Sequence, residues 1–168
     1  MHAHWKTQLF ALSLGVGLLT AAQLSAQVPS AIAIPNLPIA AIFHAEGAQV
    51  YECMRTSDGK LVWQAREPTA TLIFDGSTIG RHYAGPRWEH VDGSTVRAKS
   101  VSSAPGTTED DIPWLRLDVV DQRGSGMLSG VTNVQRINTQ GGVARGACDE
   151  AGRFRSVPYS ADYVFLRG

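Results

Sequence analysis

The chain has 168 residues, of which 43% are hydrophobic and 18% charged, and its 15 basic and 15 acidic residues leave no net charge. This composition is that of an ordinary single-domain globular protein, and it excludes a disordered chain. The balanced charge also argues against nucleic acid as a partner, because binding to phosphates requires a basic excess.

The first 26 residues have the pattern of a secretory signal peptide. Lys6 precedes an uncharged apolar run over residues 9–22, and small residues follow it. A membrane-spanning helix would need about 20 continuous apolar residues, whereas prolines follow this run closely. We therefore expect cleavage near residue 26, with Ala22 and Ala33 as alternative sites. The protein is then exported, either periplasmic or secreted, with no stable membrane span after cleavage.

The mature chain is expected to begin with an extended, proline-containing lead-in over residues 27–38, which is not a packed element. Residues 39–168 are then expected to form a single β-rich domain. In its first half, Asp-Gly pairs supply the positive φ angles that tight hairpin turns need, and Pro68 is expected to break a strand. The strands predicted there cover residues 39–44, 49–55, 61–66, 70–74 and 79–90.

The second half of the domain continues the same pattern. Leu115, Leu117 and Val119 alternate with Arg116 and Asp118, as in a half-buried antiparallel strand. No segment after residue 26 predicts a helix of three turns. The fold class is therefore all-β, an antiparallel sandwich or barrel of about eight to ten short strands. The strands predicted in this half cover residues 95–102, 115–119, 127–138 and 159–166.

Two cysteines, Cys53 and Cys148, remain after removal of the signal. Export would carry them into an oxidising compartment, where disulfides persist, so we expect them to be linked. The bridge would close a loop of about 95 residues, for which loop-closure entropy gives roughly 4 to 5 kcal/mol. Two separately buried thiols are the alternative.

Residues 80–90 hold the densest group of side chains that could bind a ligand. A bend at Gly85-Pro86 would bring together an imidazole, an indole and a guanidinium, which commonly furnish a pocket, and Trp88 could stack on a sugar ring or an aromatic ligand. In the alternative interpretation, the aromatic side chains pack a corner of the fold, and a histidine makes one structural hydrogen bond. The candidate ligand-binding residues are His82, Tyr83, Arg87, Trp88 and His90.

Metal sites and cofactor sites are not favoured by the residue spacing. His82, His90 and Glu89, with His44, are suitable ligands chemically, but no pair has the spacing that presets a metal site. The acidic run over residues 109–111 offers carboxylates for calcium without the spacing of a calcium loop. We therefore expect no metal and no cofactor.

Three classes of function remain open. The first is a non-catalytic exported domain, expected to be a monomer, that binds a small molecule, a glycan or an envelope protein. The second is a hydrolase or lyase in which His82 acts as general base and Arg87 or Tyr83 steers an anion. The third is a structural or self-associating envelope component, which should expose an apolar patch or a sheet edge.

Five blocks of sequence resemble successive segments of a secreted domain family of unknown function found in bacteria and fungi. The resemblance runs from residue 39 to residue 165, and both cysteines fall where this family places them. Some fungal relatives are labelled malate dehydrogenase, but this chain lacks the dinucleotide fingerprint and the α/β pattern of such an enzyme. The blocks are GAQVYEC (47–53), RHYAGPRW (81–88), IPWL (112–115), VQRINTQGG (134–142) and VPYSADY (157–163).

Overall fold

The computed structural model describes residues 28–168, so the predicted signal peptide lies outside the described residues. A single 3-10 turn, η1 (Ser30–Ile32), precedes eight β-strands. The strands are β1 (Ile39–Arg55), β2 (Leu61–Phe74), β3 (Ser77–Tyr83), β4 (Arg87–His90), β5 (Thr95–Ala104), β6 (Trp114–Arg123), β7 (Val131–Gly141) and β8 (Phe154–Arg167).

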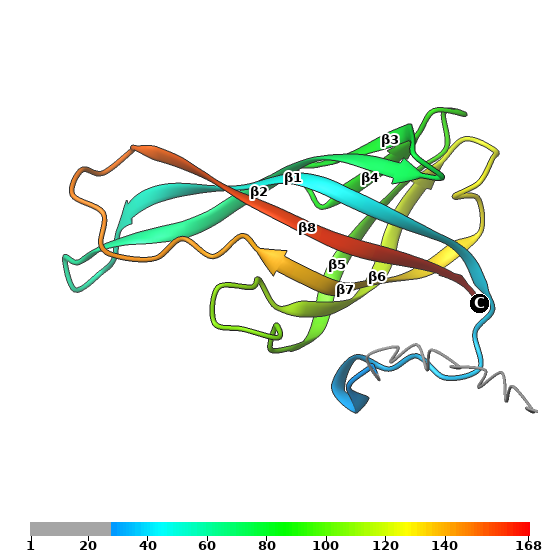
Figure 1. The fold of residues 1–168 in the computed structure, drawn as a ribbon, viewed down its shortest axis with the longest axis horizontal. Coiled ribbons are helices and arrows are strands. Elements are labelled where there is room, and N and C mark those ends of the chain that lie inside the picture. Colours follow the sequence, from blue (N-terminus) through cyan, green and yellow to red (C-terminus); the bar gives the residue numbers. More distant parts are fainter. Residues whose placement is uncertain (1–27) are drawn as a thin grey trace, which may run out of the picture.

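The eight strands form a closed antiparallel barrel in chain order, shown in Figure 1. Each strand pairs with the next one, and β8 returns to pair with β1. The predicted all-β antiparallel class is confirmed, and of the two predicted architectures the barrel is the one observed. Within residues 28–168, no helix has the length and hydrophobicity that crossing a membrane would require. An eight-stranded barrel encloses an interior that side chains can fill or that can hold one small ligand.

The first two predicted strands are one continuous strand, β1, of 17 residues. Its central part pairs with β2 on one side and with β8 on the other. At Gly47 the neighbouring strand comes so close that a Cβ atom would lie 2.1 Å from the Thr69 carbonyl oxygen. Glycine is therefore required at this position by close backbone approach, and it does not interrupt the strand.

Pro68 lies inside β2, so the prediction that it breaks the strand is wrong. The reason is the position of Pro68 in the sheet. On one side it pairs with Gln49 of β1, whereas β3 begins to pair with β2 only at Ala70. The missing N–H of the proline therefore falls on a free edge, where no ladder hydrogen bond is lost. Beyond this point β1, β2 and the start of β8 extend past the barrel as a long ribbon, visible in Figure 1.

The β6–β7 connection also differs from the prediction, because strand structure begins at Val131 and not at residue 127. Two side chains that follow β4 hold this connection. Asp92 accepts a hydrogen bond from the Met127 N–H (2.7 Å), and the Ser94 hydroxyl accepts one from the Leu128 N–H (3.1 Å). These contacts fix a turn in which the Leu128 side chain is fully buried.

The core fills the barrel interior with side chains from every strand. Aromatic rings dominate its centre: Phe43 and Phe165 lie 5.3 Å apart, and Trp88 meets Phe165 edge-on at 6.0 Å. Aliphatic side chains such as Leu72 and Val134, both fully buried, surround these rings. Burying apolar area of this kind is the main term that stabilises a fold.

The lead-in before β1 is packed, so the expectation that it is not a packed element is wrong. Ile32 is 0% exposed and lies against Ala104 and Trp114 on the outside of the barrel. The Gln135 side-chain amide donates to the Ile32 carbonyl at 2.7 Å, and the Ser102 hydroxyl donates to the Ala31 carbonyl. A three-residue turn carries no periodic pattern, which is why its burial was not foreseen.

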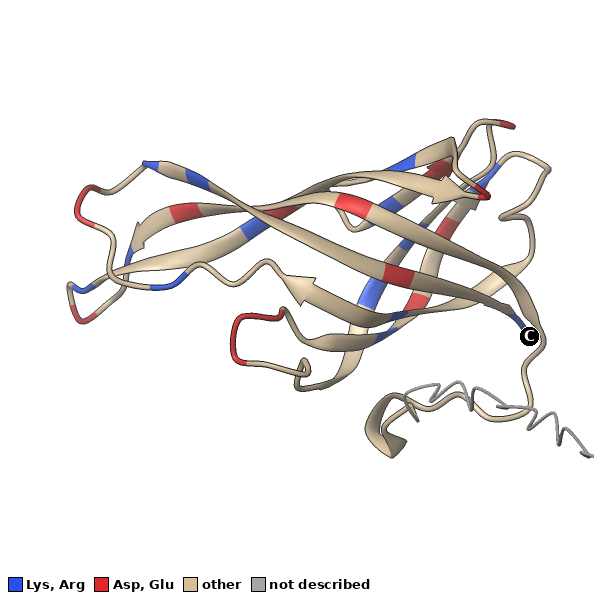
Figure 2. Ribbon diagram, in the orientation of Figure 1, with Lys and Arg blue, Asp and Glu red and all other residues tan. Residues whose placement is uncertain are grey.

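The predicted disulfide between Cys53 and Cys148 is confirmed. It ties the loop before β8 to β1 in the ribbon that extends past the barrel. Two backbone hydrogen bonds accompany it, from the Cys53 N–H to Arg153 (2.8 Å) and from the Gly152 N–H to Cys53 (2.9 Å). Acidic and basic residues are intermixed along the strands and loops (Figure 2), so no strand carries a run of one sign.

Candidate ligand-binding site

The predicted cluster lies on the β3–β4 hairpin, which divides it between two faces. In the register of this hairpin His82 pairs with Trp88, and Tyr83 pairs with Arg87. Cross-strand partners share a face, and successive residues alternate between faces. His82 and Trp88 therefore point into the barrel, where both are buried, while Tyr83 and Arg87 lie on the outer face.

His82 is 3% exposed, and its ring stacks on Trp88 with 4.4 Å between ring centroids and 8° between ring planes. Its Nδ1 atom lies 2.9 Å from the Arg87 carbonyl oxygen. Because a carbonyl can only accept, Nδ1 carries the proton, and Nε2 is left as an acceptor. The structure records no hydrogen bond to this Nε2 atom among residues 28–168.

Burial lowers the pKa of His82 to about 3, although its hydrogen bond to Arg87 acts in the opposite direction. The imidazole is therefore neutral at physiological pH. A base of such low pKa abstracts protons poorly near pH 7, and Tyr83 and Arg87 lie on the opposite face of the hairpin. Neither the pKa of His82 nor the geometry of the hairpin therefore supports the alternative in which His82 is a general base with Arg87 or Tyr83 steering an anion.

Trp88 is 1% exposed, and its indole N–H has no hydrogen-bond partner among the described residues. The ring is held by His82 on one face and by Tyr163, whose ring centroid is 5.2 Å away. A buried donor without a partner loses free energy, so each such group calls for an explanation. The indole N–H groups of Trp63 and Trp114 are also unpaired, but neither ring lines the cavity described next.

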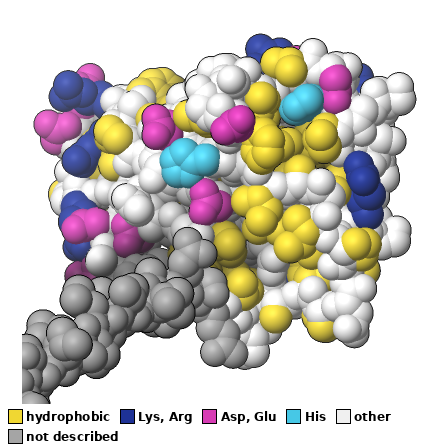
Figure 3. All heavy atoms as spheres, turned by 45° about the vertical axis from the view of Figure 1, so that its right-hand side comes forward, with side chains coloured by type: hydrophobic (Ala, Val, Ile, Leu, Met, Phe, Trp, Pro, Cys, Tyr) yellow, Lys and Arg dark blue, Asp and Glu magenta, His cyan; other side chains and the backbone are white. Residues whose placement is uncertain are grey.

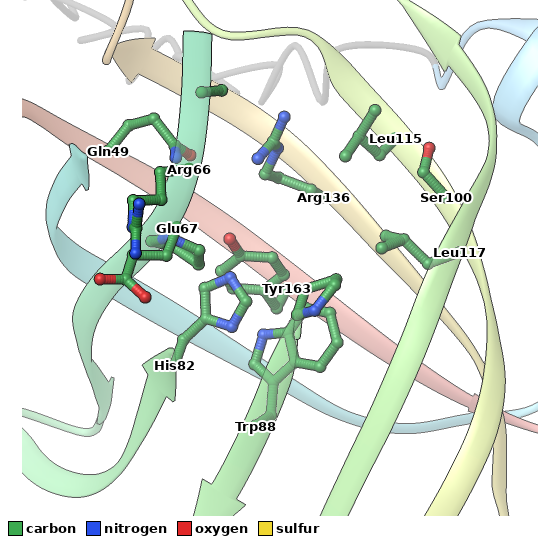
Figure 4. A pocket seen from close by; sticks show the side chains of 13 residues that line it. Gln49, Arg66, Glu67, His82, Trp88, Ser100, Leu115, Leu117, Arg136 and Tyr163 are labelled. Carbon is green, nitrogen blue, oxygen red and sulfur yellow. The ribbon is translucent and has the colours of Figure 1, made fainter. Parts of the chain in front are cut away.

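A cavity of about 210 Å³ lies against the stacked rings of His82 and Trp88, inside the end of the barrel from which the β1–β2 ribbon extends. Figure 4 shows both rings rising from β3 and β4 towards Tyr163 and Arg136. All eight strands contribute to its wall, which identifies it as the barrel lumen. Its lining residues are Gln49, Ala65, Arg66, Glu67, Pro68, His82, Pro86, Trp88, Ser100, Leu115, Leu117, Arg136 and Tyr163.

The cavity joins the core to the surface. At its inner end Tyr163 and Leu117 are buried, whereas Arg66 and Ser100 at its outer end are exposed. The Tyr163 hydroxyl lies 3.2 Å from the hydroxyl of Tyr159. Burial raises the pKa of both phenols, so both stay protonated and available as hydrogen-bonding groups.

Arg136 contributes a positive charge to the lining. Its Nε and Nη2 atoms both donate to the Pro113 carbonyl, at 3.0 and 2.7 Å. Within the described part of the chain, no carboxylate lies within ion-pair distance of this guanidinium. Arg136 thus brings an uncompensated positive charge to the cavity.

The sequence prediction found only part of this site. His82 and Trp88 line the cavity, but Tyr83, Arg87 and His90 do not. Arg136 and Tyr163 were missed because strand pairing brings them to the hairpin from distant parts of the chain. One signal was present in the sequence: residue 136 falls on the inward face of β7, two residues after the buried Val134.

The remaining predicted residues make surface contacts. The Tyr83 hydroxyl donates to Glu89 at 2.9 Å, and Glu89 also accepts two hydrogen bonds from Arg81 at 2.9 and 3.0 Å. His90 lies at the other end of β4, where its ring stacks on Phe43 with 5.7 Å between centroids, and its Nδ1 atom lies 2.9 Å from a carboxylate oxygen of Asp92. These contacts account for the Tyr83 and His90 side chains without a ligand.

The side chains considered for metal binding do not converge. His82 points inward, while Glu89 on the outer face is held by Arg81. Over residues 28–168 no group of three or more potential metal ligands is assembled. In the acidic run, Asp111 accepts hydrogen bonds from Thr108 and from the Gly141 N–H, and the other two carboxylates pair with Arg145.

The sequence profile of one protein family matches residues 35–79 and 73–167, which together include every strand of the barrel. The family is described as "Protein of unknown function (DUF3455)". The chain belongs to this family. Membership confirms the resemblance to a family of unknown function, and the family transfers no activity to the cavity. Comparison with curated proteins gave no match, and comparison with solved structures gave none.

The burial of His82 makes the stability of the barrel dependent on pH. In the unfolded chain this imidazole is protonated below about pH 6.5, whereas in the folded protein it stays neutral down to about pH 3. The stabilising contribution is therefore complete above pH 6.5 and is lost as the pH falls. Between pH 7 and pH 5 we expect the free energy of unfolding to drop by about 2 kcal/mol from this group.

Urea unfolding of the wild type and of His82→Gln at both pH values measures this contribution. The variant keeps every other titrating group. Its free energy of unfolding should therefore fall by about 2 kcal/mol less between pH 7 and pH 5 than that of the wild type. Equal pH dependence in the two proteins would show that the imidazole is not buried in its neutral form.

Proposed function

We propose that this protein is an exported binding protein that holds one small, single-ring ligand in the lumen of its barrel. The observation that carries the proposal is a buried, unpaired donor in the wall of a cavity. Trp88 supplies this donor, its indole N–H, and His82 beside it presents Nε2 as a second polar atom. A ligand that accepted a hydrogen bond from the buried Trp88 N–H would remove the cost of leaving that group unpaired.

The size of the cavity limits the ligand. A cavity of roughly 150 Å³ in another protein holds a benzene ring, and the lumen here offers about 210 Å³. One ring with a short polar substituent therefore fits, and a larger cofactor does not. Leu115 and Leu117 on one side and the rings of Trp88 and Tyr163 on the other provide apolar walls for such a ring.

Burial also distinguishes between the three partners considered from the sequence. A glycan chain or an envelope protein would need an exposed face of Trp88 in order to dock on this ring. Trp88 has none, because it is 1% exposed and His82 covers one face of its ring. A small molecule that enters the lumen is the partner that can reach it.

Export supports this role, and the disulfide supports export. The Cys53–Cys148 bridge is typical of proteins that leave the reducing cytosol. The packed position of Ile32 also bears on processing, because cleavage after Ala33 would remove this buried side chain and two hydrogen-bonded carbonyls. This packing favours the cleavage site expected near residue 26 over the alternative after Ala33.

A second role, association through the surface, is favoured by one feature. Exposed apolar side chains gather on the face seen in Figure 3. Ile39 and Ile42 at the start of β1, Phe74 at the end of β2 and Val91 after β4 all lie at the same end of the barrel. This end is opposite the cavity. The patch contains no unpaired buried group, so the lumen remains the better supported site.

Isothermal titration calorimetry with benzamide, a neutral single-ring probe, tests the proposed function. Saturable binding is expected, and Trp88→Phe should weaken the affinity about tenfold, because it keeps a ring but removes the N–H donor. Trp63→Phe is the matched control, since the Trp63 indole is also unpaired but lies outside the lumen. If both variants bind like the wild type, or if neither benzamide nor benzoate binds, the proposal is wrong.

A further inference from the structure

We infer that the lumen selects a ligand whose ring carries a carboxylate, with Arg136 as the group that recognises it. This inference rests on the proposed function, since it names the chemical class of the ligand for the same cavity. It assigns to Arg136 a role that the β3–β4 cluster alone could not predict.

The guanidinium of Arg136 is positioned before any ligand arrives. Two of its nitrogen atoms, Nε and Nη2, hold the Pro113 carbonyl, which fixes the plane of the group. Arginine presents five N–H donors in a rigid fork that suits carboxylates. The donors not used by Pro113 belong to a side chain that lines the cavity, so little conformational freedom is lost when an anion binds.

The charge on Arg136 reaches the interior of the barrel. Burial is the largest effect on the pKa of the surrounding groups, and it raises the pKa of Tyr51, Tyr159 and Tyr163 and lowers that of His82. Arg136 acts to lower the pKa of all four groups, as a nearby positive charge does. Burial opposes any charged ligand, but Arg136 offsets part of this cost for an anion and adds repulsion for a cation.

The other charged residues of the lining do not cancel this charge. Arg66 forms an ion pair with Glu52. Glu67 is the single acidic residue of the lining, and it makes no ion pair with Arg136. It sits on β2 beside the exposed Arg66, where water screens its charge. Its carboxylate opposes the binding of an anion. Removing the Glu67 charge should therefore strengthen anion binding, whereas removing the Arg136 charge should weaken it.

The two polar atoms of the stacked rings fit the same ligand. The Trp88 N–H can donate to a carboxylate oxygen, while the lone pair of His82 Nε2 repels one. The carboxylate therefore belongs on the side of Arg136 and Trp88. His82 Nε2 then suits a hydroxyl or N–H substituent on the ring.

Titration of the purified protein with three probes of similar size tests the inference: benzoate is an anion, benzamide is neutral and benzylamine is a cation at neutral pH. In low salt, benzoate should bind about tenfold more tightly than benzamide, and benzylamine should bind most weakly. Raising the salt concentration to about 0.5 M should weaken benzoate and leave benzamide unchanged.

Variants assign the preference to its residue. Arg136→Gln should remove the preference for benzoate over benzamide, and Glu67→Gln should increase the affinity for benzoate by about two- to threefold. Since Arg136→Gln also loses contacts to Pro113, its thermal unfolding is compared with that of the wild type, and the Glu67 variant provides an independent readout. Equal binding of benzoate and benzamide, unchanged by either variant, overturns the inference and leaves the proposed function intact. Failure of all three probes to bind overturns both.

Discussion

Replacing both Cys53 and Cys148 with alanine is expected to lower the free energy of unfolding by about 3 kcal/mol. The two residues are 95 positions apart in the sequence, so the bridge restricts the unfolded chain over a long loop. In the folded protein it also holds the loop before β8 against β1, where the ribbon has no barrel behind it. Urea unfolding of the wild type and the double variant measures the difference.

Reduction of the wild type supplies the control for this prediction. Dithiothreitol should lower the stability of the wild type to that of the double alanine variant, and it should not affect the variant itself. A loss below about 1 kcal/mol would mean that the backbone hydrogen bonds between Cys53 and residues 152–153 hold the loop without the bridge.

Truncation of Trp88 to alanine is the second change with a large expected effect, a loss of about 3 to 5 kcal/mol of stability. The indole is 1% exposed and contacts three other rings, those of His82, Tyr163 and Phe165. Its removal would enlarge the lumen and leave those rings without a neighbour, and a barrel wall of paired strands cannot collapse to fill the space.

Phe154→Ala is the matched control for this truncation, because Phe154 is 59% exposed on the ribbon. We expect it to change stability by less than about 1 kcal/mol. Thermal or urea unfolding of the two variants separates the cases. If Trp88→Ala is as stable as Phe154→Ala, the indole is not a core side chain. The large expected loss is also the reason that binding is tested with Trp88→Phe, which keeps a ring in place.

The sequence was sufficient for the class of the fold because every half-buried strand alternates its side chains. The residues from Leu115 to Val119 illustrate this, and Leu117 is buried as that pattern predicts. Alternation does not distinguish a sandwich from a barrel. That choice depends on whether β8 pairs with β1, two strands whose paired residues are more than 100 positions apart along the chain. The prediction that Pro68 breaks its strand was wrong for the same reason. The effect of a proline depends on whether another strand pairs with β2 on the side that lacks the N–H donor.

The residues of the candidate site that lie on one hairpin could be predicted from the sequence. The residues that join them only when the barrel closes could not. His82 and Trp88 are six residues apart on one hairpin, so their proximity follows from a bend at Gly85, whose φ is 106°. Alternation along the hairpin places Tyr83 and Arg87 on the face opposite His82 and Trp88, so only part of the predicted cluster reaches the cavity. Arg136 enters through its pairing with Leu115 on β6 and Tyr163 on β8, and this register cannot be read from any short segment.

The indole N–H signal of Trp88 in a ¹⁵N–¹H correlation spectrum tests the central claim most directly. Of the four tryptophans in the chain, three lie in the described residues, and only one of these three lines the lumen. On titration with benzoate, the Trp88 N–H signal should shift with saturation, and the signals of Trp63 and Trp114 should stay in place. If calorimetry detects binding of benzoate but the Trp88 signal does not move, the lumen is not the binding site.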